Sequence, residues 1–171
     1  MIVVNEAVGG STLTNISGRN PFSVDRYKNI PADADYITIK LGINDNNQNA
    51  ALGTIDSMDN TTFYGAWNVV LDYLTERFPK TKIGIIVTNG SSLQYVNATI
   101  ECANKWGIPY LNLATDENIP LMIRTNRTDV TQVAIDRRNR AFGVNWGVNN
   151  HPNEIAHEFE STIVENWLRS L

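Results

Sequence analysis

Several residue types are scarce in this sequence, and each scarcity excludes a class of protein. The 171 residues hold one cysteine, Cys102, which excludes an intrachain disulfide framework and a cysteine-based zinc site. Two histidines, His151 and His157, are too few for a His-rich metal cluster. Acidic residues outnumber basic ones by 18 to 14, and this balance argues against a nucleic-acid partner held by a basic surface. No apolar run approaches the ~20 residues of a membrane span, so we expect no membrane partner.

The residues that are present fit one globular domain. Hydrophobic residues make up 42% of the chain and charged residues 19%, which is enough to bury a core. No internal repeat, low-complexity tract or linker divides residues 1–171, and the length suits a single domain. The apolar residues 1–4 are too few for a secretory signal, and the sequence does not determine the compartment.

Short β-branched runs alternate with amphipathic helical runs along the chain. Strands are predicted for the segments Ile2–Val8, Asp35–Leu41, Lys82–Thr88 and Ile108–Leu113. Helices are predicted for Thr61–Phe78, for Ser91–Trp106, and for a last segment that begins at Pro152. This alternation favours an α/β protein, a three-layer α/β/α sandwich around a parallel sheet.

Two segments are less regular. Residues 11–31 predict a polar loop with one helical turn near Val24. Residues 124–150 predict a long excursion with a short helix around residues 129–142. The excursion carries a group of basic residues, namely Arg124, Arg127, Arg137, Arg138 and Arg140. This group is either a solvated helix face or a rim that meets an anionic glycan or another subunit.

Three short motifs lie where ligands bind in open parallel sheets, beyond the carboxyl ends of strands. G-G-S-T at residues 9–12 follows the first predicted strand, and G-I-N-D at residues 42–45 follows the second. H-P-N at residues 151–153 opens the last helix. Taken singly, each motif is explained by turn chemistry or by a structural histidine.

Taken together and in this order, the motifs resemble the SGNH (GDSL-type) hydrolase superfamily over residues 2–171. That family is named for a serine nucleophile, an oxyanion-hole glycine, an oxyanion-hole asparagine and a catalytic histidine. The resemblance implies that Gly10 and Asn44 are the oxyanion-hole donors, that His151 is the base, and that Asp45 organises the loop presenting Asn44. It further implies a flavodoxin-like parallel sheet and a carboxylic ester hydrolase that needs no metal or organic cofactor.

The nucleophile block of the family is missing. The family's Gly-Asp-Ser lies at the end of a strand before the glycine block, and no Gly-Asp-Ser occurs in residues 1–171. Ser11, Ser91 and Ser92 match neither that motif nor its place in the fold. We therefore expect the nucleophile to be absent from this chain and the sheet to lack its first strand, which in the family lies between the first two predicted here. Truncation explains this better than another segment filling the gap.

The acid of the catalytic triad is missing as well. The family carries Asp three residues before the histidine, and this chain carries Val148 there. We expect Asn149, Asn150 or a main-chain carbonyl to orient His151, which gives a Ser–His dyad without a carboxylate.

The resemblance thus implies a serine esterase that acts on acyl esters, foremost acetyl esters on carbohydrate, so its partner is a small ester or an acetylated glycan. Residues 113–123 and 163–171 resemble a subgroup from Gram-positive bacteria and their phage tail proteins, which would place the protein at a cell surface or in a virion. The alternative is a non-catalytic glycan-binding or structural module that retains the fold. The sequence does not determine the oligomeric state.

Overall fold

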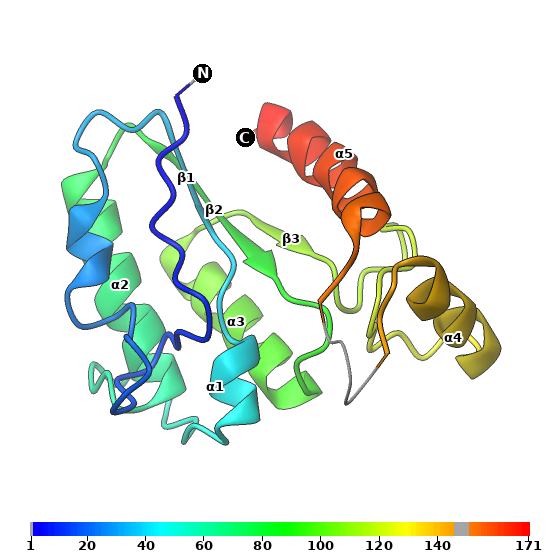
Figure 1. The fold of residues 1–171 in the computed structure, drawn as a ribbon. Coiled ribbons are helices and arrows are strands. Elements are labelled where there is room, and N and C mark those ends of the chain that lie inside the picture. Colours follow the sequence, from blue (N-terminus) through cyan, green and yellow to red (C-terminus); the bar gives the residue numbers. More distant parts are fainter. Residues whose placement is uncertain (1, 146–150) are drawn as a thin grey trace.

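A computed structural model describes residues 2–145 and 151–171 (Figure 1). Its strands are β1 (Tyr36–Ile39), β2 (Lys82–Val87) and β3 (Tyr110–Asn112). Its α-helices are α1 (Ile43–Asn47), α2 (Phe63–Arg77), α3 (Leu93–Trp106), α4 (Gln132–Ala141) and α5 (Glu154–Ser170), and a 3-10 turn, η1, spans Arg26–Asn29.

The three strands form one parallel sheet in the order β1-β2-β3. β2 lies in the middle, and its residues 83–87 are all buried, as the nearly continuous apolar run predicts for a strand covered on both faces. Helices α2 and α3 connect consecutive strands. The predicted α/β class and parallel sheet are confirmed.

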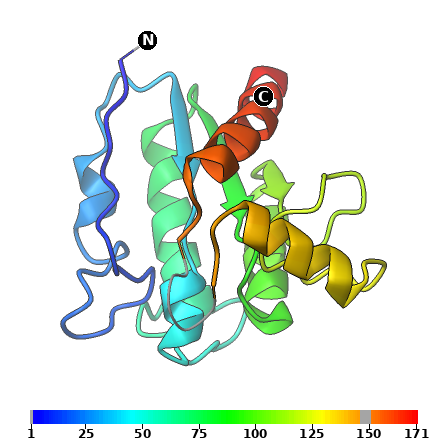
Figure 2. The same ribbon diagram turned by 45° about the vertical axis from the view of Figure 1, so that its right-hand side comes forward.

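The helices cover the two faces of the sheet as separate layers (Figures 1 and 2). Helices α2 and α3 cover one face, where Phe63, Trp67 and Leu71 are fully buried. Helix α5 covers the other face by resting on β2: a Cβ added at Gly84 would lie 2.4 Å from the ring of Trp167. The predicted three-layer sandwich is therefore present.

Local sequence signals fix the helix boundaries. α2 begins after Thr62, whose hydroxyl accepts the Gly65 N–H at 3.3 Å, and α3 ends at Gly107, which has a φ of +64°. α5 begins after Asn153, which caps the Ala156 N–H at 3.1 Å, two residues later than the predicted start at Pro152. Among the described residues, no helix is both long and apolar enough to cross a bilayer.

The predicted strand at residues 2–8 is wrong. This segment runs alongside β1 as irregular chain (Figures 1 and 2), and Ile2, Val3 and Val4 are 94, 74 and 55% exposed. Within the part of the chain that the structure describes, two of its carbonyls accept hydrogen bonds: that of Val8 from the Ser11 N–H, which closes a turn, and that of Glu6 from the side chain of Arg26. β-branched residues favour an extended chain, but a strand also needs a hydrogen-bonded neighbour, and this segment has none in the described structure.

Among residues 2–145 and 151–171, β1 is paired along one edge only. The Lys82 N–H donates to the Asp35 carbonyl at 3.1 Å, so the main-chain groups of Ile37 and Ile39 point toward β2. Those of Tyr36 and Thr38 point the other way, toward residues 2–8, and both side chains are exposed. We call this second edge of β1 the free edge.

Candidate functional site

The glycine block forms a turn at the carboxyl-end side of the sheet. Gly10 is exposed and has a φ of +75°, and the Ser11 N–H closes the turn on the Val8 carbonyl at 3.1 Å. A Cβ added at Gly10 would meet no atom within 4 Å. The main chain at Gly10 is therefore open to an approaching ligand.

Asn44 is presented by the turn that follows β1. Gly42 caps α1 with a φ of +114°, and a Cβ added there would lie 3.2 Å from the ring of Phe63. The Asn44 Nδ2 donates to the Ser11 carbonyl at 2.8 Å, so it touches the residue next to Gly10. Because an amide nitrogen carries two hydrogens, the second can be donated to a ligand.

Asp45 connects the turn that carries Asn44 to the segment that follows Gly10. Its carboxylate is fully buried and accepts the Leu13 N–H at 2.9 Å, the Thr14 N–H at 2.8 Å and the Thr14 hydroxyl at 2.6 Å. A buried charge is tolerated when its oxygens are satisfied in this way. The resulting clamp sets the position of Gly10 relative to Asn44.

His151 is exposed and stands two residues before the cap of α5. The cap itself is held against the end of α4, because the Asn153 N–H donates to the Phe142 carbonyl at 2.9 Å. Figures 1 and 2 both place the start of α5 at the same end of the sheet as α1. His157 is an exposed residue of α5, as predicted for a helix surface.

Three predicted residues near His151, namely Val148, Asn149 and Asn150, lie outside the described residues. The prediction that an amide or a main-chain carbonyl orients His151 therefore stays a prediction.

The structure places the three candidate serines in loops and at the start of α3. Ser11 is buried, and its carbonyl accepts the Asn44 amide. Ser91 is buried too, with its hydroxyl 3.0 Å from that of Thr88. Ser92 is exposed, and its N–H donates to Asn46 Oδ1 at 3.0 Å at the start of α3.

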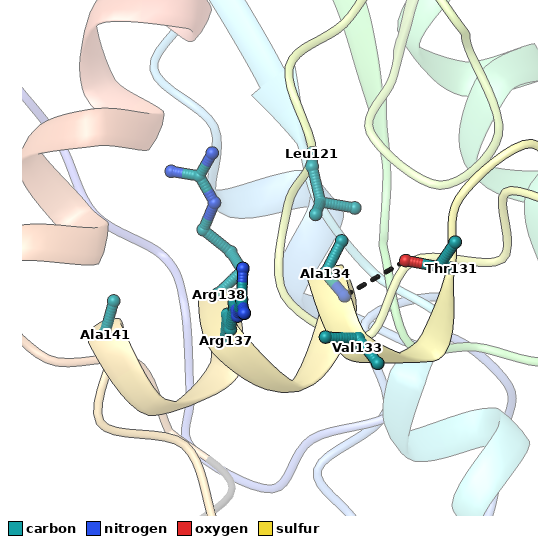
Figure 3. Close-up of a pocket in the computed structure, with 7 residues that line it drawn as sticks. All are labelled: Leu121, Thr131, Val133, Ala134, Arg137, Arg138 and Ala141. Atoms are coloured by element: carbon teal, nitrogen blue, oxygen red, sulfur yellow. Dashed lines mark hydrogen bonds between the residues drawn. The ribbon is translucent and has the colours of Figure 1, made fainter.

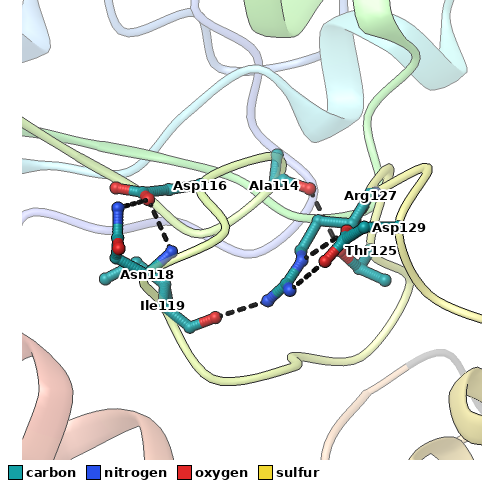
Figure 4. Close-up of polar contacts among 7 residues, drawn as sticks. All are labelled: Ala114, Asp116, Asn118, Ile119, Thr125, Arg127 and Asp129. Carbon is teal, nitrogen blue, oxygen red and sulfur yellow. Dashed lines mark hydrogen bonds and ion pairs between the residues drawn. The ribbon is translucent and has the colours of Figure 1, made fainter.

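The structure separates the arginines that the sequence grouped as one cluster. Arg127 pairs with Asp129 at 2.5 Å and donates to the Ile119 carbonyl at 2.7 Å (Figure 4). Arg138 stacks on the rings of Phe142 and Phe159, at 5.2 and 5.0 Å from their centroids.

The remaining arginines differ in exposure. Arg137 and Arg140 are exposed on α4, and Arg137 lines an open hollow of about 410 Å³ with Leu121 and Val133 (Figure 3). Arg124 is half-buried at the end of the sheet, and burial lowers the pKa of its guanidinium. The sequence contains no signal for this difference, because it depends on which distant residues each arginine meets.

No protein-family model matches this sequence, and no curated protein matches it either. Solved structures do match its fold. A protein from Lactobacillus plantarum superposes with a TM-score of 0.74 and 28% identity, over 94% of this chain and 77% of its own.

Two Bacteroides proteins named as GDSL-like lipases have the same fold. The one from Bacteroides ovatus superposes with a TM-score of 0.66 and 18% identity, over 95% of this chain and 69% of its own. The one from Bacteroides uniformis gives a TM-score of 0.55 and 19% identity, over 78% of this chain and 66% of its own. The predicted GDSL-type fold is therefore confirmed.

Proposed function

We propose that this chain is an ester hydrolase module in which Gly10 and Asn44 form the oxyanion hole and His151 is the base. The nucleophile is a serine carried by a strand that pairs with the free edge of β1. The observation that carries the proposal is the contact of the Asn44 amide with the Ser11 carbonyl, which joins the glycine block to Asn44. That pair lies at the carboxyl end of β1, where ligands bind in sheets of this kind.

The chemistry follows from these roles. The serine attacks the acyl carbon while His151 removes its proton, and the Gly10 N–H and the Asn44 amide stabilise the oxyanion. His151 then protonates the leaving alcohol, and water releases the acyl group by the same steps in reverse. Each oxyanion donor is worth about 3–4 kcal/mol in comparable acyl-transfer sites.

The expected dyad makes this a slow catalyst. Removing the acid from a comparable triad costs about 10⁴-fold in rate. Asn149, Asn150 or a main-chain carbonyl orients His151 in this proposal, since Val148 stands where the family has an acid.

The proposed substrate is an acyl ester, foremost an acetyl ester on a glycan. This substrate class rests on the sequence resemblance, as does a place among the proteins of Gram-positive bacteria and phage tails. Small acetyl esters suit an exposed site such as that of Gly10 and His151.

A second candidate is a non-catalytic glycan-binding or structural module with the same fold. The burial of the Ser11 and Ser91 side chains favours it, because neither offers an exposed hydroxyl to a substrate.

Hydrolysis of 4-nitrophenyl acetate distinguishes the two functions. The chain as it stands should be no faster than its Asn44→Ala variant, because no acyl-enzyme can form without a nucleophile. A version with a strand ending in Gly-Asp-Ser fused ahead of residue 1 should turn over, and Asn44→Ala should then lower kcat by about 10²–10³-fold. Asn97→Ala, an exposed asparagine of α3, is the matched control and should change nothing.

Two results would contradict parts of this proposal. One is an Asn44-dependent rate in the chain without the added strand, which would support the esterase but place its nucleophile within residues 1–171. The other is a folded strand-fused version with no turnover, which supports the non-catalytic module.

A further inference from the structure

Helix α1, which carries Asn44, is only five residues long. A helix of this length has no stability of its own, because fixing the first turn costs more than its few hydrogen bonds return. Its N-terminal cap is Gly42, so no capping side chain strengthens it. The direction of the Asn44 side chain therefore depends on the bonds between α1 and the segments around it.

Two residues of α1 bond to the segment that follows Gly10. The Asn44 amide donates to the Ser11 carbonyl at 2.8 Å, and the Asp45 carboxylate accepts the N–H groups of Leu13 and Thr14. These bonds all reach one stretch of chain. They restrain α1 from one side only.

Asn46 restrains α1 from the other side. Its Oδ1 accepts the N–H of Ser92, the residue before α3, at 3.0 Å. Residues two apart in a helix of 3.6 residues per turn point about 200° apart, so Asn44 and Asn46 leave α1 on nearly opposite sides. Figures 1 and 2 both show α1 between the N-terminal loop and the start of α3. The Tyr95 hydroxyl also holds the chain just beyond α1, by donating to the Ala50 carbonyl at 2.5 Å.

We propose that Asn46 is a positioning residue of the oxyanion hole. By accepting the Ser92 N–H it fixes the rotation of α1, and this rotation directs the second hydrogen of the Asn44 amide toward the oxyanion. An oxyanion donor is effective when it is held in place before the reaction, because no reorganisation is then needed. The inference rests on the proposed function, which makes Asn44 the donor. Asn46 acts through Asn44 and touches neither the substrate nor the reacting atoms.

NMR relaxation of the ¹⁵N-labelled chain as it stands tests the inference without requiring turnover. The measured quantity is the order parameter of the Asn44 side-chain NH₂ group. Asn46→Ala should lower it from about 0.85, the value of a rigid group, to below about 0.6. The urea midpoint of unfolding should change little, because the Ser92 N–H is exposed and can bond to water instead. Asn46→Asp keeps an acceptor oxygen and should keep the Asn44 group ordered.

Matched variants isolate this one hydrogen bond. Ser92→Pro removes the donor and leaves Asn46 intact, and the φ of −64° at Ser92 is the value that proline requires. It should lower the Asn44 order parameter as much as Asn46→Ala does, and the double variant should lower it no further. Gln48→Ala changes an exposed residue at the end of α1 and should have no effect.

The strand-fused version supplies a kinetic measurement. Asn46→Ala should lower kcat for 4-nitrophenyl acetate by about tenfold and leave KM unchanged, since a misdirected donor weakens the transition state more than the bound substrate. This loss is smaller than the one expected for Asn44→Ala, because the donor itself remains.

An Asn44 group that stays ordered in Asn46→Ala and in Ser92→Pro would overturn the inference. A large fall in the urea midpoint of both variants would overturn it too, because the bond would then stabilise the whole fold. A loss of Asn44 order in both variants at an unchanged midpoint, together with no turnover after strand fusion, would support the positioning of Asn44 by Asn46 and reject the enzyme.

Discussion

The two sides of β1 differ in how completely they are built. On the side of β2 and β3, the central strand is buried along residues 83–87 and helices cover both faces. On the other side, the main chain of Tyr36 and Thr38 is unpaired in the described structure, and apolar residues 2–4 face solvent. The first side is a paired and covered part of the sheet, whereas the second is an exposed strand edge to which another strand can pair.

The comparison also shows where the candidate site lies. Gly10 belongs to the open side and Asn44 follows β1, so the oxyanion-hole residues stand at the boundary between the two sides. Two sets of bonds tie them together across this boundary: those of the Asp45 carboxylate to Leu13 and Thr14, and that of the Asn44 amide to the Ser11 carbonyl. A nucleophile at the free edge of β1 would be delivered next to these bonds.

The largest expected effect contrasts one apolar residue from each side. Ile85→Ala removes a fully buried side chain of β2 and should lower the free energy of unfolding by about 2–5 kcal/mol. Val3→Ala, at a position 74% exposed, should change it by less than about 0.5 kcal/mol. Urea unfolding measures both. Equal losses would mean that residues 2–8 are packed in solution.

The next effect concerns the boundary itself. Asp45→Ala leaves two main-chain N–H groups and one hydroxyl without their acceptor, so it should cost about 3 kcal/mol. Asp56→Ala removes an exposed carboxylate that pairs with Lys105 and should cost less than about 1 kcal/mol. If the two variants unfold at the same urea concentration, the bonds of Asp45 do not contribute to stability beyond those of an exposed ion pair.

The smallest expected effect concerns the reactivity of the one cysteine thiol, that of Cys102. Burial raises the pKa of the Cys102 thiol to about 12, so Ellman's reagent should not react with it at pH 8 until the protein unfolds. A thiol introduced by Val4→Cys on the open side should react at once in the folded protein. Rapid reaction of Cys102 would show that the α2–α3 layer opens readily.

The same pKa shift predicts a pH dependence of stability. Because the folded pKa of Cys102 lies above its unfolded value, the contribution of the protonated thiol to stability is complete below the unfolded pKa, about 8.5. It is lost as the pH rises toward 12. Cys102→Ala should flatten this alkaline loss in urea unfolding.

Sequence patterns predicted most of the core, because periodicity and caps are local signals. The buried run of β2 and the capped helices α2, α3 and α5 lie within two residues of their predicted bounds. The strand prediction for residues 2–8 was wrong because β propensity does not supply a hydrogen-bonding partner. The sequence did not show that the five arginines have different surroundings. Arg124, for example, contacts Gly90 and Asn139, which lie far from it in sequence.

The site motifs were found in the sequence, but their geometry was not. The resemblance pointed to Gly10, Asn44 and Asp45. The bonds of Asp45 to Leu13 and Thr14, which precede it by 32 and 31 positions, are seen only in the folded chain. The tie between Asn46 and Ser92 had no sequence signal, since an asparagine in a short helix is most simply a solvated residue.

Amide hydrogen exchange of β1 tests the central claim most directly. In the chain as it stands, the amides of Ile37 and Ile39 should be protected by β2, while those of Tyr36 and Thr38 should exchange as fast as in an irregular chain. In the strand-fused version, Tyr36 and Thr38 should become protected as well. Protection of these two amides before fusion, or its absence in a folded fusion, would contradict the claim that the free edge of β1 receives the strand that completes the site.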